Sequence, residues 1–442
     1  MFGTDGIRGV SGAFPVSAEG ARKVGFAIAE ILKKNKPAPL VAVGRDTRKC
    51  GAGLQDEICR GLTGAGARVV CAGICPTPAV VSLIIESGAE AGIMVSASHN
   101  PPEYNGFKVF NSDGLKIPQE AEAEIESEFG KSGDLPPPRN GEENGLWKTV
   151  YGDALGGSAP EGRDFSGIKI ALDCANGAMS EIAPEIFEKT GAALYTIGCE
   201  PDGDNINSGC GSLQPAALGR EVRRRGAAFG AALDGDGDRV SFCCENGREV
   251  DGDKIIALFA AAMVETQTLK KPSVAATVMS NKGLEIFLEN MGLKMVRTAV
   301  GDRNVADAMK KEGLNFGGEK SGHLIFSDYS TGGDGLLAAL LMADMVKEKN
   351  KPLSLILPEF DLFPQVLKNV RVRERKSFDS MPGLRGLVAA REKKLGRAGR
   401  IHIRYSGTEP LARVLVEGED ESAVNSAAEE IVETIKRAGG AP

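Results

Sequence analysis

Residues 40–71 read LVAVGRDTRKCGAGLQDEICRGLTGAGARVVC, and they predict a strand, a turn, a helix and a second strand. Residues 40–44 and 67–71 are short apolar runs, while residues 53–64 carry apolar side chains at the i, i+3 and i+4 spacing of an amphipathic helix. Gly64 is placed to end that helix. This order of elements favours a βαβ unit with parallel strands.

The same pattern occurs twice more along the chain. The second and third copies have a strand, a helix, a glycine and a strand at residues 168–173, 181–190, 191 and 192–196, and at 273–278, 283–291, 292 and 293–296. In each copy a later strand runs into a polar loop, at residues 96–100, 234–238 and 318–323. Because ligands bind beyond the carboxyl ends of parallel strands, we expect three related α/β domains with mixed, mostly parallel sheets, each of which contributes one loop to a shared site.

The pattern changes near residue 362. Strands and helices of an α+β module are predicted at residues 366–372, 383–392, 399–405, 413–417 and 421–436. We therefore expect four domains, at residues 1–150, 151–253, 254–361 and 362–442. A stretch rich in Gly, Pro and charge at residues 131–143 predicts a surface loop near the first boundary.

The composition is that of a folded chain and excludes disorder as its main state. Of the 442 residues, 42% are hydrophobic and 26% are charged. The 57 glycines predict many tight turns in which the backbone approaches a ligand. The net charge of −7 argues against nucleic acid or a membrane as the partner. An anionic substrate would therefore be bound by local cationic loops.

The cysteines and the N-terminus predict a cytoplasmic protein. The nine cysteines are scattered and form no Cys-x-x-Cys pair, which favours reduced, buried thiols over a zinc site. The first residues, MFGTDGIRG, carry Asp5 and Arg8 where a signal peptide needs an apolar core.

The loop at residues 234–238 predicts a metal site. Asp234, Asp236 and Asp238 alternate with glycine after an apolar strand, so three carboxylates can converge on a hard cation such as Mg²⁺, Mn²⁺ or Ca²⁺. An EF-hand is excluded because Arg239 stands where its turn needs glycine. Arg239 itself is placed to offset the negative charge or to contact a phosphoryl group.

A second loop, SASHNP at residues 96–101, predicts a covalent nucleophile. Ser98 lies on a turn of small residues with His99 beside it, and Lys108 follows ten residues later. A serine hydrolase is disfavoured because no Gly-x-Ser-x-Gly elbow is present. The alternative is a polar turn between a strand and a helix.

Two further loops carry groups that suit a phosphorylated polyol. Glu319, Ser321 and His323 stand on a Gly-rich turn, where carboxylate and hydroxyl can pair with vicinal sugar hydroxyls, although a surface turn is the alternative. A phosphate cradle is predicted around RYSGTEP, with the residues Arg404, Ser406, Gly407, Thr408 and Arg413. Its alternative is a β-turn with incidental arginines.

Cations near the N-terminus extend this set. Arg8 lies in a Gly-rich segment at residues 3–9, and Arg45 and Arg48 lie in the loop after the first strand. Each arginine has a solvated surface position as its alternative interpretation.

Eight motifs resemble those of the α-D-phosphohexomutase family, in family order along almost the whole chain. They are FGTDGIRG at 2–9, SASHNP at 96–101, DCANGA at 173–178, CEPDGDNIN at 199–207, LDGDGDR at 233–239, VGDRNV at 300–305, GGEKSGH at 317–323 and SGTEPLARV at 406–414. The resemblance implies four domains around a central cleft.

The resemblance also implies roles for the residues of the loops. Ser98 would be the phosphorylated serine, and Ser98 with the three aspartates Asp234, Asp236 and Asp238 would hold Mg²⁺. The catalytic set would be Ser98, Lys108, Arg8 and His323. The substrate-binding set would be His99, Arg239, Glu319, Ser321, Arg404, Ser406, Gly407, Thr408 and Arg413.

The implied reaction exchanges the 6- and 1-phosphates of a hexose through phosphoserine and a 1,6-bisphosphate. Glucosamine is the expected sugar, in amino sugar metabolism, and glucose or mannose is the alternative. The expected partners are a phosphosugar substrate, a glucose or glucosamine 1,6-bisphosphate activator and a second subunit of a homodimer. The segment 102–108, Lys320 and Tyr405 depart from the glucosamine pattern, and they keep the alternative sugars open.

Overall fold

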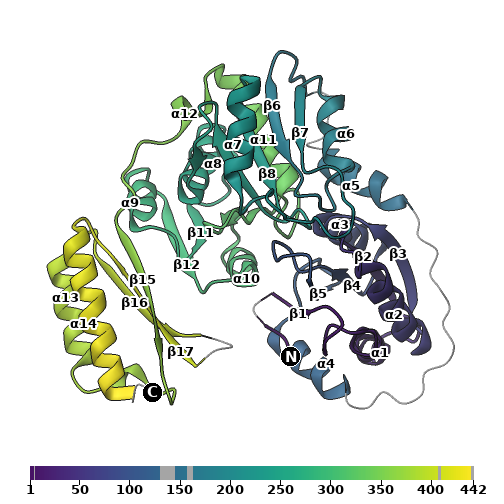
Figure 1. Cartoon of the computed structure of the whole chain (residues 1–442), viewed down its shortest axis with the longest axis horizontal. Helices are drawn as coiled ribbons and strands as arrows, with labels where there is room; N and C mark the ends of the chain where they lie inside the picture. The colour runs from purple at the N-terminus through teal and green to yellow at the C-terminus, as the bar shows by residue number, and fades with distance from the viewer. Residues whose placement is uncertain (4, 130–144, 157–162, 407–409, 440–442) are drawn as a thin grey trace. The chain divides into compact units, whose positions relative to one another are not determined.

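The computed structural model describes residues 1–3, 5–129, 145–156, 163–406 and 410–439 (Figure 1). The chain forms two compact units, Met1–Lys271 with Ala299–Leu357, and Pro272–Thr298 with Pro358–Pro442. The surface loop predicted at residues 131–143 lies outside the described residues.

The first unit begins with a five-stranded mixed sheet in the order β1-β5-β4-β2-β3. Its strands are β1 (Ile7–Val10), β2 (Leu40–Arg45), β3 (Arg68–Ile74), β4 (Ala91–Val95) and β5 (Tyr104–Asn111). β2 is parallel to β3 and β4, whereas β5 is antiparallel to β4 and β1. The strand, helix and strand predicted for residues 40–71 are thus confirmed, with the predicted parallel pairing.

Helices cover both faces of this sheet. They are α1 (Ala18–Lys33), α2 (Gly51–Gly64), α3 (Thr77–Ser87), α4 (Gln119–Phe129) and α5 (Leu146–Gly156). Ile28 of α1 and Ile58 of α2 share a core with Ile93 of β4, while Ile84 of α3 packs on Gly92 from the other face. Gly64 is the last residue of α2, and Gly66, with φ 94°, makes the left-handed turn that leaves the helix.

A second sheet has the order β10-β9-β8-β6-β7, in which β9-β8-β6-β7 repeats the topology of β5-β4-β2-β3. Its edge strand β10 follows the repeat in the chain, whereas β1 precedes it. It contains β6 (Lys169–Asp173), β7 (Ala193–Ile197), β8 (Phe229–Leu233), β9 (Val240–Cys244) and β10 (Glu249–Val250), with helices α6 (Ile182–Lys189) and α7 (Pro215–Arg225). β6 is parallel to β7 and β8, and β9 is antiparallel to β8 and β10. The shared order confirms that the first two sequence repeats are related units.

The rest of the first unit carries the third polar loop. It contains α8 (Gly252–Glu265), α10 (Asp302–Glu312), β13 (Phe316–Gly318), β14 (Leu324–Phe326), α11 (Gly335–Lys349) and α12 (Leu353–Ile356). β13 and β14 pair antiparallel, so the loop between Gly318 and Leu324 closes a hairpin. Phe259 of α8 packs against Phe316 and Phe326, which anchors that hairpin.

The second unit combines a βαβ piece with the predicted α+β module. Its elements are β11 (Ser273–Thr277), α9 (Lys282–Asn290), β12 (Lys294–Thr298), β15 (Gln365–Arg371), the 3₁₀ turn η1 (Phe378–Ser380), α13 (Leu384–Leu395), β16 (Arg400–Tyr405), β17 (Leu411–Glu417) and α14 (Glu421–Gly439). β11 and β12 are parallel, whereas β15-β17-β16 is an antiparallel sheet with α13 and α14 on one face (Figure 1). The buried carboxylate of Glu417 accepts hydrogen bonds from Arg400 and from the backbone N–H of Lys282, which joins the two pieces.

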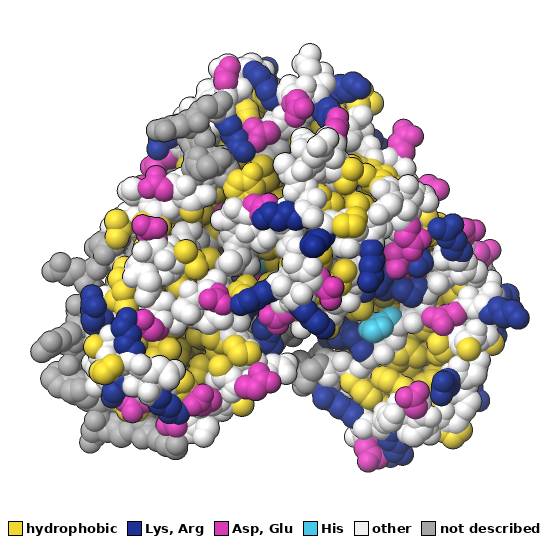
Figure 2. Space-filling model, turned by 180° about the vertical axis from the view of Figure 1, so that it is seen from behind, with side chains coloured by type: hydrophobic (Ala, Val, Ile, Leu, Met, Phe, Trp, Pro, Cys, Tyr) yellow, Lys and Arg dark blue, Asp and Glu magenta, His cyan; other side chains and the backbone are white. Residues whose placement is uncertain are grey.

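The distribution of charged side chains and the state of the cysteines can be compared with what the composition predicts. Lys and Arg are interspersed with Asp and Glu over the face shown in Figure 2. All nine cysteines are free thiols, and seven of them are buried. Among the described residues, none of the helices has both the length and the apolar character needed to cross a bilayer.

The close packing of α1 on α2 yields a stability prediction. A Cβ added at Gly61 would lie 2.0 Å from the carbonyl oxygen of Arg22, whereas a Cβ at the exposed Gly53 of the same helix would meet no atom within 4 Å. Gly61→Ala should therefore lower the free energy of unfolding by about 1–3 kcal/mol through overpacking. Gly53→Ala should raise it by about 0.5–1 kcal/mol, because alanine loses less backbone entropy in a helix.

Urea unfolding of both variants measures the two effects. Equal changes of stability at the two positions would contradict the close helix contact, since intrinsic helix propensity would then account for both.

Candidate active site

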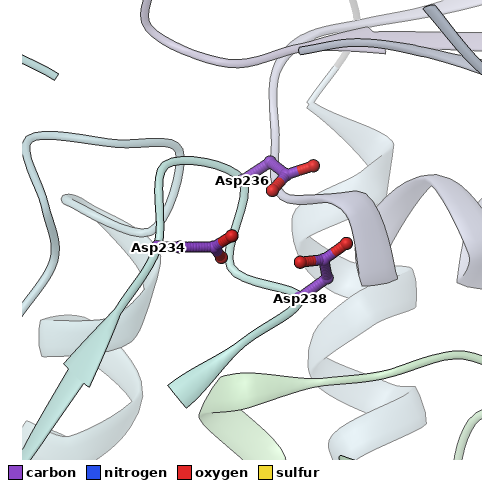
Figure 3. Close-up of side chains that lie close together, drawn as sticks. All are labelled: Asp234, Asp236 and Asp238. Carbon is purple, nitrogen blue, oxygen red and sulfur yellow. The ribbon is translucent and has the colours of Figure 1, made fainter. Parts of the chain in front are cut away.

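Three carboxylates converge on the loop that follows β8. Asp234, Asp236 and Asp238 are all buried, and one oxygen of each lies within 4.8 Å of an oxygen of the others. Figure 3 shows the three side chains turned toward one another from a single loop. The predicted convergence of the alternating aspartates is therefore present in the structure.

Lys108 of β5 places its ammonium group among these carboxylates. Its Nζ donates to Asp236 Oδ2 at 2.6 Å and to Asp238 Oδ2 at 2.5 Å, and the side chain is buried. Burial favours the neutral amine, but Asp236 and Asp238 outweigh it and raise the pKa of Lys108 well above its usual value. Lys108 therefore remains a cation in this site.

Asp234 lacks the hydrogen bond from the Lys108 ammonium group that Asp236 and Asp238 each accept. Burial, followed by repulsion from Asp238 and Asp236, raises the pKa of Asp234 well above its usual value. For Asp238 burial also opposes ionisation, but Lys108 outweighs it and holds the pKa of Asp238 below its usual range. The three carboxylates of the loop thus carry more negative charge than the nearby cations neutralise.

The Ser98 hydroxyl faces this cluster. Ser98 Oγ donates to Asp234 Oδ2 at 2.5 Å, although 136 residues separate the two in the chain. Ser98 has φ 54°, in the left-handed region that side chains other than glycine rarely adopt. This turn aims the hydroxyl at the carboxylates, and such strain persists only where the surroundings impose it.

A buried arginine imposes that turn. Arg48 is nearly inaccessible, is paired with Asp46, and donates to the carbonyl oxygens of Ser98 at 3.0 Å and Asn100 at 2.8 Å. Asn207, in the loop between β7 and α7, donates to the same two carbonyls. The solvated alternative for Arg48 is therefore wrong. The motif CEPDGDNIN contained Asn207, but its spacing did not reveal the role.

His99 lies between the serine and Arg239. Its Nδ1 accepts from Arg239 Nη1 at 2.6 Å and lies 3.4 Å from Ser98 Oγ. Burial and then the Arg239 guanidinium lower the pKa of His99 to about 4. His99 is therefore a neutral group near pH 7 that can accept or donate a hydrogen bond.

The hairpin loop adds Glu319 and His323 to the same unit. Both are buried, and His323 Nδ1 lies 3.9 Å from Asp238 Oδ1. Ser321 is exposed at the tip of the loop. Lys320, which departs from the glucosamine pattern, forms an ion pair between its Nζ and Asp251 at 3.0 Å. The Asp251 carboxylate thus compensates the charge of this lysine.

Arg8 of β1 lies on the serine side of the cluster. Its Nη1 donates to Asn100 Oδ1 at 3.4 Å, and its Nη2 pairs with Asp5. Asp5 also pairs with Lys116 and lies 3.9 Å from Lys108 Nζ. Asp5 and Lys116 belong to the polar network around the cluster, and sequence reasoning missed Lys116 because it lies in no motif.

The predicted phosphate cradle lies in the second unit. Arg404 of β16 stands opposite Arg413 of β17, and Arg413 donates to the buried Ser406 hydroxyl at 3.5 Å. Burial and the facing guanidinium of Arg413 lower the pKa of Arg404. Like charges directly opposite on a sheet are unfavourable, so this pair is suited to an anion. Gly407 and Thr408 lie outside the described residues.

Tyr405 has a local structural reason to stand in that loop. Its ring stacks on Phe378 at 4.3 Å between centroids, and its hydroxyl donates to the carbonyl oxygen of Lys376. A lysine at this position would make neither the stack nor the same packing.

The residues at the cluster fit a divalent cation. Asp236 Oδ1 and Asp238 Oδ1 are buried, and neither finds a hydrogen-bond partner within the described part of the chain. Carboxylate oxygens are the ligands that hard cations prefer, and a cation would relieve the repulsion at Asp234. Asp234, Asp236, Asp238 and the Ser98 hydroxyl would hold it.

Family comparisons cover almost the whole chain in four consecutive parts. Profiles for phosphoglucomutase/phosphomannomutase alpha/beta/alpha domains I, II and III match residues 1–135, 152–247 and 251–363, and the C-terminal domain profile matches residues 367–434. The chain belongs to the phosphoglucomutase/phosphomannomutase family. The prediction of four domains, three of them related, is confirmed by these matches.

Curated members of this family are similar to the chain over almost their full length. A phosphoglucosamine mutase of Syntrophotalea carbinolica is 43% identical, with 99% of this chain and 97% of the relative covered. A phosphoglucosamine mutase of Allorhizobium ampelinum is 45% identical, with 98% and 97% covered.

Solved structures of the phosphoglucomutase/phosphomannomutase family share the fold. A family protein of Burkholderia thailandensis superimposes with a TM-score of 0.81 at 23% identity, covering 100% of this chain and 99% of that one. The N-acetylphosphoglucosamine mutase of Aspergillus fumigatus, solved in complex with GlcNAc-6P and magnesium, has a TM-score of 0.68 at 18% identity, with 99% and 96% covered. The family profiles and the curated relatives, rather than these structures, show that the chain is an enzyme, a phosphohexomutase of the isomerase class, in a metal-dependent family.

Lys108 contacts two of the carboxylates that could hold a metal ion, which yields a second prediction. Lys108→Met should lower the metal-free stability by about 3–5 kcal/mol, because buried carboxylates lose their cation. Mg²⁺ should then raise the melting temperature by more than it does in the unsubstituted protein, since binding to the folded state adds stability.

Thermal unfolding in chelator and in Mg²⁺ measures both quantities. The control is Lys49→Met, which removes an ion pair with Asp204 whose side chains are 75% and 68% exposed; it should change stability by less than about 1 kcal/mol. The same Mg²⁺-induced shift in the Lys108 variant and the unsubstituted protein would contradict this picture.

Proposed function

We propose that the enzyme interconverts glucosamine 6-phosphate and glucosamine 1-phosphate, as a step of amino sugar metabolism that supplies UDP-N-acetylglucosamine and cell-wall precursors. The observation that carries the proposal is the Ser98 hydroxyl, held by a left-handed turn at 2.5 Å from Asp234 within a cluster of three buried carboxylates. The full-length relatives named phosphoglucosamine mutase support the choice of sugar.

In this proposal Ser98 carries the phosphoryl group. Phosphoserine 98 gives that group to the free hydroxyl of the bound sugar phosphate, which forms the 1,6-bisphosphate. The bisphosphate then reverses its orientation in the site, and its other phosphoryl group is transferred to Ser98. The Oγ–P bond of phosphoserine 98 breaks as a bond forms between that phosphorus and the attacking sugar oxygen, which gives up its hydroxyl proton. In the second half the Ser98 hydroxyl oxygen attacks the other phosphorus of the bisphosphate, the bond from that phosphorus to the sugar oxygen breaks, and the sugar oxygen takes up a proton. Phosphoryl transfer depends mainly on positioning and charge stabilisation.

The surrounding residues supply those two requirements. Lys108 and Arg8 would stabilise the charge that develops near Ser98, and His323 would hold or move the proton of the attacking hydroxyl. His99 and Arg239 would contact the reacting phosphoryl group. Mg²⁺ is the proposed cation at the aspartates, where it would neutralise phosphoryl charge.

The remaining groups would bind the rest of the substrate. Glu319 and Ser321 would contact sugar hydroxyls. The non-reacting phosphate would bind at Arg404, Ser406 and Arg413, together with Gly407 and Thr408. A flat, facing pair of arginines suits the bidentate recognition of phosphate.

Other parts of the proposal concern organisation and cofactors. The domains are proposed at 1–150, 151–253, 254–361 and 362–442. A glucose or glucosamine 1,6-bisphosphate would restore the phosphoserine when its phosphoryl group is lost. The protein would act in the cytoplasm. It would form a homodimer.

Replacement of Ser98 tests the covalent step. Ser98→Ala should retain less than about a thousandth of the turnover, as expected when a nucleophile is lost. Intact-protein mass measurement should show one phosphoryl group on the unsubstituted protein after bisphosphate treatment and none on the variant. Near-normal turnover by Ser98→Ala would contradict the phosphoserine mechanism.

Side-by-side turnover of glucosamine, glucose and mannose 6-phosphates tests the sugar. We expect the highest kcat/KM for glucosamine 6-phosphate, since the relatives named above are phosphoglucosamine mutases. The ratio of kcat/KM between two sugars measures the specificity of the enzyme. A higher value for glucose or mannose phosphate would replace the proposed substrate with that sugar and leave the reaction class intact.

A further inference from the structure

The segment VGDRNV at residues 300–305 has no role in the proposed reaction, yet it opens α10 beside the active site. Asp302 is the first residue of α10, and Gly301 immediately precedes it. Each of the three residues Gly301, Asp302 and Arg303 makes a contact with a group outside its own helix. The segment therefore joins three parts of the first unit.

Arg303 joins α10 to the domain that carries Ser98. Its Nη1 donates to Glu122 Oε1 of α4 at 2.7 Å and to the carbonyl oxygen of Ile117 at 3.0 Å. Both charged side chains are only 13% exposed. Burial raises the pKa of Glu122, and the Arg303 charge opposes that shift. A pair this well covered restricts α10 more than an exposed pair does.

Asp302 makes a second link to the same domain. Its Oδ2 pairs with Lys116 Nζ at 2.5 Å, and Lys116 also pairs with Asp5. Burial opposes the charge on both partners, but their attraction outweighs it, raising the pKa of Lys116 and lowering the pKa of Asp302. The Asp302 carboxylate also lies 3.5 Å from His323 Nε2.

Gly301 connects these links to the hairpin loop. Its backbone N–H donates to Glu319 Oε1 at 3.0 Å, at the positive end of the α10 dipole. Glu319 is buried, so the direction of its carboxylate depends on this donor. The position of the donor depends in turn on where α10 begins.

We propose that Arg303 and Asp302 are positioning residues: by fixing the start of α10 to Glu122 and Lys116, they set the Gly301 N–H that orients Glu319 for the hydroxyls of the sugar. The inference rests on the proposed function only for the role of Glu319. The mechanical link from Arg303 to Glu319 is a property of the fold, and it is measured separately from turnover.

Hydrogen exchange measures the link itself. In Arg303→Met, the amides of residues 300–303 and 317–323 should exchange faster than in the unsubstituted protein. The matched control is Lys310→Met, which removes the exposed pair with Asp113 between the same helix and the same domain, at 63% and 58% exposure. Exchange in the control should be unchanged. Equal exchange in Arg303→Met and the unsubstituted protein would overturn the proposal.

A double-mutant cycle measures the consequence for turnover. Arg303→Met and Glu319→Ala should each lower kcat/KM by about 10- to 100-fold, since small misplacements of substrate-positioning groups cost this much. In the Glu319→Ala background, Arg303→Met should cost less than about twofold more, because it acts through Glu319. Additive losses, or full activity of Arg303→Met, would overturn the proposal.

Two further variants separate positioning from a loss of folding. Arg303→Lys keeps a cation for Glu122 and should restore most of kcat/KM. Arg303→Met combined with Glu122→Leu leaves no unpaired, partly buried carboxylate at this position, and it should show the same kinetic loss with a recovered melting temperature. Recovery of activity together with stability would assign Arg303 a purely structural role. Failure of the unsubstituted protein to convert any hexose phosphate would reject the proposed function, while hydrogen exchange would still decide the link.

Discussion

Three buried carboxylates on one loop repel each other, and the surrounding structure compensates for that repulsion. At the 4.8 Å limit of their separation, two unit charges repel by about 3.5 kcal/mol at an effective dielectric constant of 20. Lys108 of β5, the Ser98 hydroxyl and the Thr77 hydroxyl at the start of α3 all point at these carboxylates. Each belongs to the first sheet domain, whereas the aspartates belong to the second. The contacts that compensate for the repulsion thus link the two domains. The remaining negative charge makes the cluster a site suited to a cation.

The serine loop shows how rigid parts maintain a strained conformation. The left-handed backbone at Ser98 is held by donors from Arg48 and Asn207, which come from two different domains. Asp46 holds Arg48 and also accepts from the Ser96 hydroxyl, so the cation and the turn are fixed by one carboxylate. A preorganised hydroxyl of this kind would need no rearrangement in the proposed phosphoryl transfer.

Local patterns were sufficient for most elements of the fold. The strands at β2, β6 and β11 and the helices after them follow from apolar runs and helical spacing, which depend on near neighbours in the chain. The convergence of the aspartates also follows from their alternation with glycine. By contrast, Arg48 in sequence is one more arginine in a polar loop, and only burial beneath the serine turn distinguishes it from a solvated side chain. Lys320 is similar, since its partner Asp251 lies 69 positions away.

The α/β repeats, the four polar loops, the chemical groups on those loops and the family of the chain could all be predicted from the order of residues alone. Three contacts came only from the folded chain: Ser98 faces Asp234, Lys108 lies between Asp236 and Asp238, and the Gly301 N–H donates to Glu319. The physical reason is the range of the forces involved. Periodicity and turn chemistry act over a few residues, whereas these contacts join segments that only the packing of sheets and helices brings together.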